Sequence, residues 1–112
     1  MKKYVILIPV YNDRESLTKL IENINSEIEG INSEISIVVI NDASSQQIID
    51  DYRNTENINS IEIINMKENR GHARCIASGL KYIYEKKEFD YVIPMDGDGE
   101  DRPEEIKNFI EL

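Results

Sequence analysis

The chain has 112 residues, of which 40% are hydrophobic and 31% are charged, a balance that predicts one globular domain and excludes a disordered segment. The formal net charge of −9 argues against nucleic acid and anionic lipid surfaces as partners, because an acidic surface repels both. Cys75 is the only cysteine, so no internal disulfide can form, and we expect a cytosolic protein in which Cys75 is a small buried residue on a helix.

The first half of the chain predicts a strand, a helix, a second strand and a weaker helix, in that order. Tyr4–Val10 and Ile35–Ile40 are dense in Ile and Val and barely alternate, which is typical of strands buried on both faces of a parallel sheet. Between them, Asn12 followed by Glu15 predicts a capping box at a helix start, and Gln46–Tyr52 is the weaker helix candidate. The apolar stripe of the first helix consists of Leu17, Leu20, Ile21, Ile24 and Ile28.

The second half continues this alternation, and no apolar run approaches the roughly 20 residues of a membrane span. Ile61–Met66 and Tyr91–Met95 are the third and fourth predicted strands, and Asp101 followed by Glu104 repeats the capping spacing, with Pro103 in the first turn. The stripes of the last two helices are Ala73, Ile76, Ala77, Leu80, Ile83 and Tyr84, and then Ile106, Phe109 and Ile110. We therefore expect residues 1–112 to form one α/β domain with an open, mostly parallel, doubly wound sheet flanked by helices.

Ligands of such sheets bind beyond the carboxyl ends of the strands, and polar or glycine-rich segments follow all four predicted strands. The segment after the fourth strand is the most informative, because residues 96–101 hold four carboxylates. This crowding is electrostatically costly unless a cation relieves it, and oxygen ligands suit Mg²⁺, Mn²⁺ or Ca²⁺. Gly97 and Gly99 allow a ligand to approach the backbone closely. Asp96 and Asp98 are the predicted metal ligands.

Two other interpretations of this acidic segment stay open. It is a plain acidic turn in which Asp101 caps the last helix, or it is a structural calcium loop. An EF-hand loop starting at Asp96 would need a glycine and a glutamate where Asp101 and Lys107 stand, so that match fails.

The other strand ends offer groups that suit a nucleotide, although the chain has neither the G-x-G-x-x-G fingerprint nor a P-loop sequence. Tyr11 offers a ring to stack on a base, or it is an ordinary packing aromatic. Asp42 can accept hydrogen bonds from a base or a ribose hydroxyl, or it caps a helix or forms a turn. Arg70 and Gly71 open a helix whose first N–H groups favour an anion. We interpret three further polar residues as surface or capping groups, namely Ser44, Ser45 and His72.

Four segments, in this order on the predicted elements, resemble family 2 glycosyltransferases of the GT-A fold, and together they span nearly the whole chain. They are the opening strand V-I-L-I-P-V-Y-N, the second strand I-V-V-I-N-D-A-S, the helix start N-R-G-H-A-R and the D-G-D of a D-x-D motif. The following G-E-D-R-P-E-E-I resembles the polyprenyl-phosphate (dolichol-phosphate-type) sugar transferases. The resemblance implies a Rossmann-like GT-A fold that is truncated after the D-x-D motif.

The resemblance also implies a role for each matching residue. The donor would be a UDP- or GDP-sugar bound with Mn²⁺ or Mg²⁺, where Asp98 binds the metal and Asp96 contacts the ribose or a metal-bound water. The sugar would pass to a lipid-phosphate or saccharide acceptor at the inner face of a membrane in the full-length protein, and no residue here matches the general base. The other implied donor-binding residues are Pro9, Tyr11, Asn12 and Asp42 at the nucleobase, Glu15 supporting that turn, Arg70 and Gly71 near the ribose and phosphates, and Gly97 in the metal motif.

Two other function classes share parts of this pattern. A non-catalytic donor-binding or assembly fragment would leave a sheet edge and apolar surface uncovered, which predicts self-association. A receiver-like signalling domain has the same size and alternation, but it carries a phosphorylated Asp after the third strand, where this chain has Asn65, Met66 and Lys67.

Overall fold

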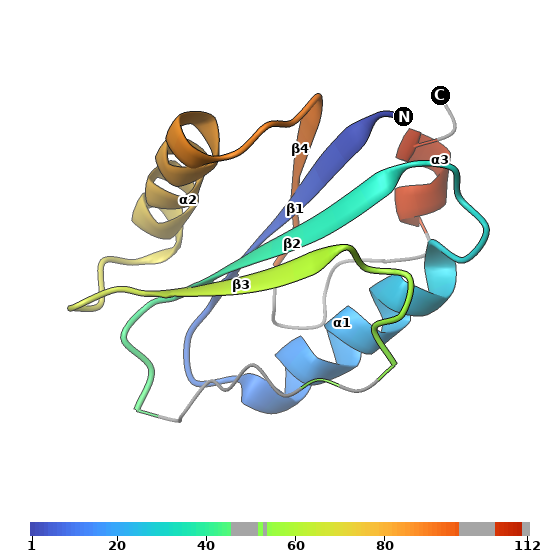
Figure 1. Ribbon diagram of the computed structural model, residues 1–112. Coiled ribbons are helices and arrows are strands. Elements are labelled where there is room, and N and C mark those ends of the chain that lie inside the picture. Colours follow the sequence, from blue (N-terminus) through green and yellow to red (C-terminus); the bar gives the residue numbers. More distant parts are fainter. Residues whose placement is uncertain (46–51, 53, 97–104, 111–112) are drawn as a thin grey trace.

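The computed structural model describes residues 1–45, 52, 54–96 and 105–110, apart from the side chain of Phe109. This part of the chain forms a four-stranded sheet with helices on both faces (Figure 1). Its elements are β1 (Lys3–Val10), α1 (Arg14–Glu27), β2 (Glu34–Asn41), β3 (Ser60–Asn65), α2 (His72–Lys86), β4 (Tyr91–Pro94) and α3 (Ile106–Ile110). All neighbouring strands are parallel, in the order β3-β2-β1-β4. The predicted α/β class and the four strands are therefore confirmed.

Several sequence-based expectations fall on residues that the structure does not describe. They are the weaker helix over Gln46–Tyr52 except for its last residue, the acidic segment from Gly97 onward, and the predicted capping residues Asp101 and Glu104. Within the described helices, none has both the length and the apolar character of a membrane span.

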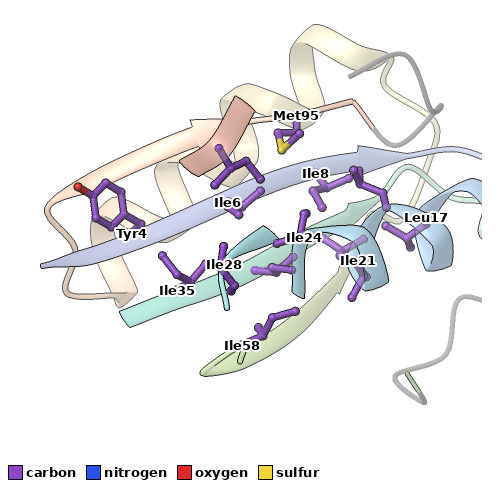
Figure 2. Packing of buried hydrophobic residues seen from close by; sticks show 14 of the residues in the cluster. Tyr4, Ile6, Ile8, Leu17, Ile21, Ile24, Ile28, Ile35, Ile58 and Met95 are labelled. Atoms are coloured by element: carbon purple, nitrogen blue, oxygen red, sulfur yellow. The ribbon is translucent and has the colours of Figure 1, made fainter. Parts of the chain in front are cut away.

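The core forms two layers because successive side chains of a strand point to opposite faces of the sheet. On one face, Ile6 and Ile8 of β1 pack with Ile21 and Ile24 of α1 and with Ile106 of α3 (Figure 2). The central strands β1 and β2 are buried on both faces after their first residue, which explains their lack of alternation. Burial of each such side chain stabilises the fold by about 1.5–3 kcal/mol.

Helix α1 confirms its predicted stripe but not its predicted cap. All five stripe residues from Leu17 to Ile28 are buried. The cap is Asp13 rather than Asn12, because the Asp13 carboxylate accepts a hydrogen bond from the Ser16 N–H at 3.3 Å. Asn12 instead lies in the left-handed region, with φ of 51°, and its side chain is used elsewhere.

Helix α2 turns a different face to the sheet from the one that its apolar spacing predicts. Cys75, Gly79 and Ile83 are its buried residues, whereas Leu80 and Tyr84 are 41% and 80% exposed. The reason is close packing at Gly79, where an added Cβ would lie 2.4 Å from the Leu7 Cδ1 atom. The helix approaches β1 and β2 along this glycine, so most of the predicted stripe faces outward.

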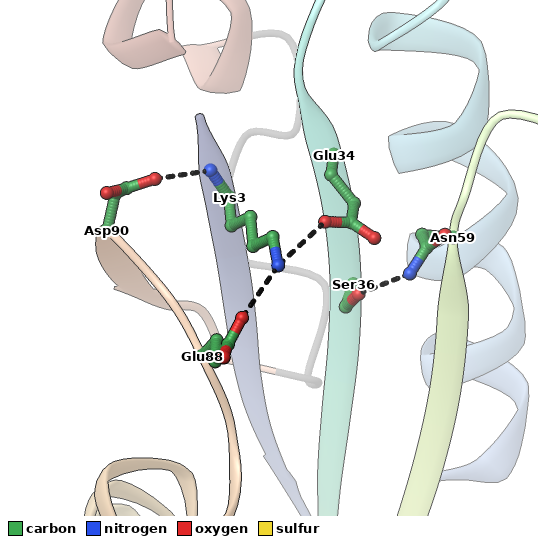
Figure 3. Close-up of polar contacts among 6 residues, drawn as sticks. All are labelled: Lys3, Glu34, Ser36, Asn59, Glu88 and Asp90. Carbon is green, nitrogen blue, oxygen red and sulfur yellow. Dashed lines mark hydrogen bonds and ion pairs between the residues drawn. The ribbon is translucent and has the colours of Figure 1, made fainter. Parts of the chain in front are cut away.

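The amino ends of the strands carry a cluster of mutually paired polar groups (Figure 3). The Lys3 N–H donates to the Asp90 carboxylate at 2.7 Å, and the Lys3 ammonium lies 3.0 Å from Glu88 and 3.9 Å from Glu34. Nearby, the Asn59 amide donates to the Ser36 hydroxyl at 3.4 Å. Lys3, Glu34 and Glu88 belong to the lining of a hollow of about 290 Å³ that contains side chains of both charges.

Candidate functional site

A pocket of about 350 Å³ lies at the opposite edge of the sheet, beyond the carboxyl ends of the strands. The chain leaves β1 toward β2 and β3 and later returns to place β4 on the other side of β1. This reversal of strand order is the topological switch point at which open α/β sheets bind ligands. The described residues that line the pocket are Pro9, Val10, Tyr11, Asp13, Asp42, His72, Cys75 and Asp96.

Asp42 forms the buried wall of the pocket and organises the start of α2. It is only 4% exposed, and its carboxylate accepts hydrogen bonds from the backbone N–H groups of Arg70 at 2.7 Å and Gly71 at 3.0 Å. Asp42 therefore holds the turn before α2, a segment distant in the sequence, rather than a cap or turn at its own position. Gly71, with φ of 87°, supplies the left-handed conformation that this turn requires.

Two opposing effects set the pKa of Asp42. Burial raises the pKa, but hydrogen bonds from the Arg70 N–H, the Cys75 thiol and the Gly71 N–H outweigh burial and hold the pKa below its ordinary 3.8. Burial and the adjacent Asp42 carboxylate raise the pKa of the Cys75 thiol to about 12. Cys75 is thus a neutral, 1% exposed hydrogen-bond donor, as its predicted burial on a helix implies.

The turns after β1 and β2 are tied together by side chains that sequence reasoning interpreted as caps. The Asn12 N–H donates to the Ser44 hydroxyl at 2.9 Å, and the Asn12 side-chain oxygen accepts from the N–H of Ser45 at 2.7 Å and from its hydroxyl at 3.0 Å. Asn41 completes the arrangement, because its side-chain oxygen accepts from the Ser44 N–H at 3.1 Å. The three hydrogen bonds of Asn12 join two loops more than 30 residues apart in the sequence.

Asp96 lies at the rim of the pocket opposite the start of α2. Its carboxylate is 3.1 Å from the His72 Nε2 atom, and the two side chains are 41% and 61% exposed. A partly exposed carboxylate of this kind suits a hard divalent cation such as Mn²⁺ or Mg²⁺. Within the described ranges, no three His, Cys, Asp or Glu side chains form a metal-binding group. The second predicted ligand, Asp98, lies outside those ranges, together with Gly97.

The pocket brings together four of the predicted site residues, Pro9, Tyr11, Asp42 and Asp96. Tyr11 is 53% exposed, which is unlike the ordinary packing aromatic that was the alternative. Arg70 and Glu15 are not among the described residues that line the pocket. The Arg70 guanidinium lies 3.3 Å from the Glu68 carboxylate, and Glu15 is an exposed residue in the first turn of α1.

Sequence reasoning missed four residues of the pocket lining, which are Val10, Asp13, His72 and Cys75. Two signals could have found them. Asp13 and His72 directly adjoin residues already predicted to belong to the site, and helix starts at this edge of the sheet point toward the ligand. His72 is the surface residue that was expected, but it also lines the pocket.

Comparison with known proteins places the chain among sugar-transferring enzymes. The family model described as Glycosyl transferase family 2 matches residues 5–112. The chain is 31% identical over 109 residues to the undecaprenyl-phosphate 4-deoxy-4-formamido-L-arabinose transferase of Pseudomonas fluorescens (strain SBW25). This match covers 95% of the chain and 30% of the relative, so the chain spans less than a third of the length of that protein.

Among solved structures, S. aureus TarS has a similar fold, with a TM-score of 0.64 and 25% sequence identity over 88% of this chain. The matched region is 17% of the chain in one TarS structure and 28% in the TarS 1–349 structures, one of which is a complex with UDP. This similarity confirms the Rossmann-like GT-A fold that the motifs predicted.

Proposed function

Because the chain belongs to glycosyl transferase family 2, we propose that it forms the donor-binding part of a glycosyltransferase and that its carboxyl-end pocket holds a nucleoside diphosphate sugar. The observation that supports this most is the position of the pocket at the switch point of the sheet, with Tyr11, Asp42 and Asp96 on its walls. The half-exposed Tyr11 ring offers a stacking surface for the base. A uridine donor is favoured because TarS is known in complex with UDP, and a guanosine donor is the alternative.

The charge of the pocket supports a role for a divalent cation. Three of its eight described lining residues are Asp, and His72 alone among these eight can carry a positive charge. A diphosphate entering such a pocket needs a cation to offset its charge. We therefore propose that Asp96 and Asp98 hold Mn²⁺ or Mg²⁺. When bound, the ion supplies Lewis acidity for departure of the nucleoside diphosphate.

The proposed acceptor is a polyprenyl phosphate, with a saccharide as the alternative. The relative from Pseudomonas fluorescens acts on undecaprenyl phosphate according to its name. A phosphate monoester already carries between one and two negative charges at pH 7, so its oxygen can attack without a general base, whereas a sugar hydroxyl needs one. We accordingly assign no catalytic residue in this chain. Transfer to a lipid acceptor would place the full-length protein in the cytoplasm, at the inner face of the membrane.

Nucleotide binding is the part of this proposal that the chain itself can test. We expect UDP or GDP to raise the melting temperature in the presence of Mn²⁺, because a ligand at about 100 times its Kd adds about 2.7 kcal/mol to the free energy of unfolding. Asp96→Asn should weaken binding at least about tenfold. Glu88→Gln, at the amino ends of the strands, is the matched control. Absence of any shift with either nucleotide, with or without metal, would contradict the proposal.

A further inference from the structure

From the hydrogen bonds between the first two loops, we infer that Asn12, clasped by Ser44 and Ser45, is a positioning residue that fixes the ring of Tyr11 at the mouth of the pocket. The inference deepens the proposed donor-binding function. It also gives Asn12 a role different from the direct nucleobase contact that the family resemblance implied. The set of Asn12, Ser44 and Ser45 is called the interloop clasp below.

The location of Asn12 indicates that it acts through its neighbours. Among the described residues, Tyr11 and Asp13 line the pocket, while Asn12 between them does not. Asp13 is itself fixed as the cap of α1, through the Ser16 N–H at 3.3 Å and the Leu17 N–H at 3.1 Å. Tyr11 is therefore flanked on its carboxyl side by a residue whose N–H and side chain both bond to the second loop.

The backbone conformation of both loops explains why the turn needs support. Asn12 and Ala43 have φ angles of 51° and 57°, a left-handed conformation that is unfavourable for a non-glycine residue. Asn tolerates this conformation better than most residues, and three hydrogen bonds from the clasp offset the cost at Asn12. The clasp therefore holds the turn after β1 in one conformation together with the cap of α1 at Asp13.

A fixed ring matters for affinity because a mobile ring must be ordered when it stacks on a base. Ordering a free side chain on binding opposes association, so a ring that is already held in place binds more tightly. Tyr11 is 53% exposed, which means that packing around the ring restrains it only in part. The hydrogen bonds of its carboxyl-side neighbour add a restraint on the backbone that carries the ring.

Ring mobility tests the clasp without any ligand. The chain has no Trp, so Tyr11→Trp introduces a single Trp that can be excited apart from the remaining Tyr residues, and its nanosecond motion appears in time-resolved anisotropy. In this background, Asn12→Gly keeps the left-handed backbone but removes the clasp oxygen, and it should enlarge the fast component of the decay. Asn12→Asp retains an acceptor for Ser45 and should leave the decay unchanged. Asn54→Gly is the matched control, because Asn54 has φ of 55° in a different loop.

An affinity cycle then tests whether Asn12 acts through Tyr11. We expect Asn12→Gly to weaken nucleotide binding roughly five- to tenfold in the natural background and less than about twofold in the Tyr11→Ala background. Ser44→Ala, which removes the acceptor of the Asn12 N–H, should weaken binding in the same direction and by a smaller factor. Circular dichroism of each variant establishes that it is folded.

The two readouts separate failure of the clasp from failure of the proposed function. An anisotropy decay that Asn12→Gly leaves unchanged would overturn the inference, and so would an equal loss of affinity in the Tyr11 and Tyr11→Ala backgrounds. A chain that binds neither UDP nor GDP would instead contradict the donor-binding function. In that case the anisotropy result still decides whether the clasp holds the residue at position 11.

Discussion

The two ends of the sheet carry hollows of similar size but opposite electrostatic character. At the amino ends, about 290 Å³ is bordered by three Lys and two Glu among the described residues, and Lys3 pairs with both Glu88 and Glu34. At the carboxyl ends, about 350 Å³ is lined by three Asp residues and a single His. Cavity volume therefore does not single out the functional end. The unbalanced charge, at the point where strand order reverses, indicates which end needs a ligand and a cation.

The largest expected effect on stability and nucleotide binding comes from substitution of Asp42, at the carboxyl ends of the strands. Asp42→Ala leaves the partly buried backbone N–H groups of Arg70 and Gly71 without their acceptor, at a cost of about 1–2 kcal/mol for each group. We expect urea denaturation to show a loss of about 2–4 kcal/mol and titration calorimetry to show no nucleotide binding. Asp42→Asn keeps one acceptor oxygen and should lose about half as much. Unchanged stability in Asp42→Ala would mean that these hydrogen bonds contribute nothing net.

Asp42, at the carboxyl ends, should also make stability depend on acid pH, and this effect should be smaller than that of the Asp42→Ala substitution. The pKa of Asp42 is lower in the folded chain than its ordinary value of 3.8, so the folded state favours the ionised carboxylate. Its contribution to stability is complete above that ordinary pKa and is lost as the pH falls through the lower, folded pKa. The stability difference between the natural chain and Asp42→Asn should thus be constant above about pH 5 and shrink below about pH 4. A difference that persisted unchanged to pH 2 would contradict the lowered pKa.

The smallest expected effect is at the amino ends. Glu88 is 89% exposed, and an exposed ion pair contributes little because water screens it. Glu88→Gln should change neither the melting temperature nor the nucleotide affinity beyond experimental error. If it weakened nucleotide binding as strongly as Asp96→Asn, the assignment of function to the carboxyl end would be wrong.

The sequence predicts the α1 side of the fold well because large apolar side chains there recur at helical spacing. Every predicted stripe residue from Leu17 to Ile28 is buried. On the α2 side the same reasoning was right for Ile83 but four of the six stripe residues are exposed, because the buried face is centred on Cys75 and Gly79, which are small. Close approach to Leu7, rather than hydrophobicity, orients this helix. Spacing rules consider only large apolar residues. They therefore cannot predict a helix face that packs closely because glycine has no side chain.

The sequence predicted which residues belong to the candidate site more completely than it predicted what each residue does there. Tyr11, Asp42 and Asp96 meet at one edge because parallel strands end there, and this follows from alternation alone. Asp42 bonds to the backbone at Arg70, and Asn12 bonds to Ser45. Both interactions depend on loop conformations with positive φ angles, which no local sequence pattern specifies. The metal ligand Asp98 stays a prediction.

Paramagnetic broadening by Mn²⁺ tests the central claim most directly, because it reports which end of the sheet binds the ion together with the nucleotide. With UDP or GDP present and a small fraction of an equivalent of Mn²⁺, the backbone amide signals of Tyr11, Gly71 and Asp96 should broaden, while those of Ser36 and Glu88 stay sharp. A sample with Mn²⁺ and no nucleotide is the control. Broadening that is stronger at the amino end, or that does not depend on the nucleotide, would contradict the account.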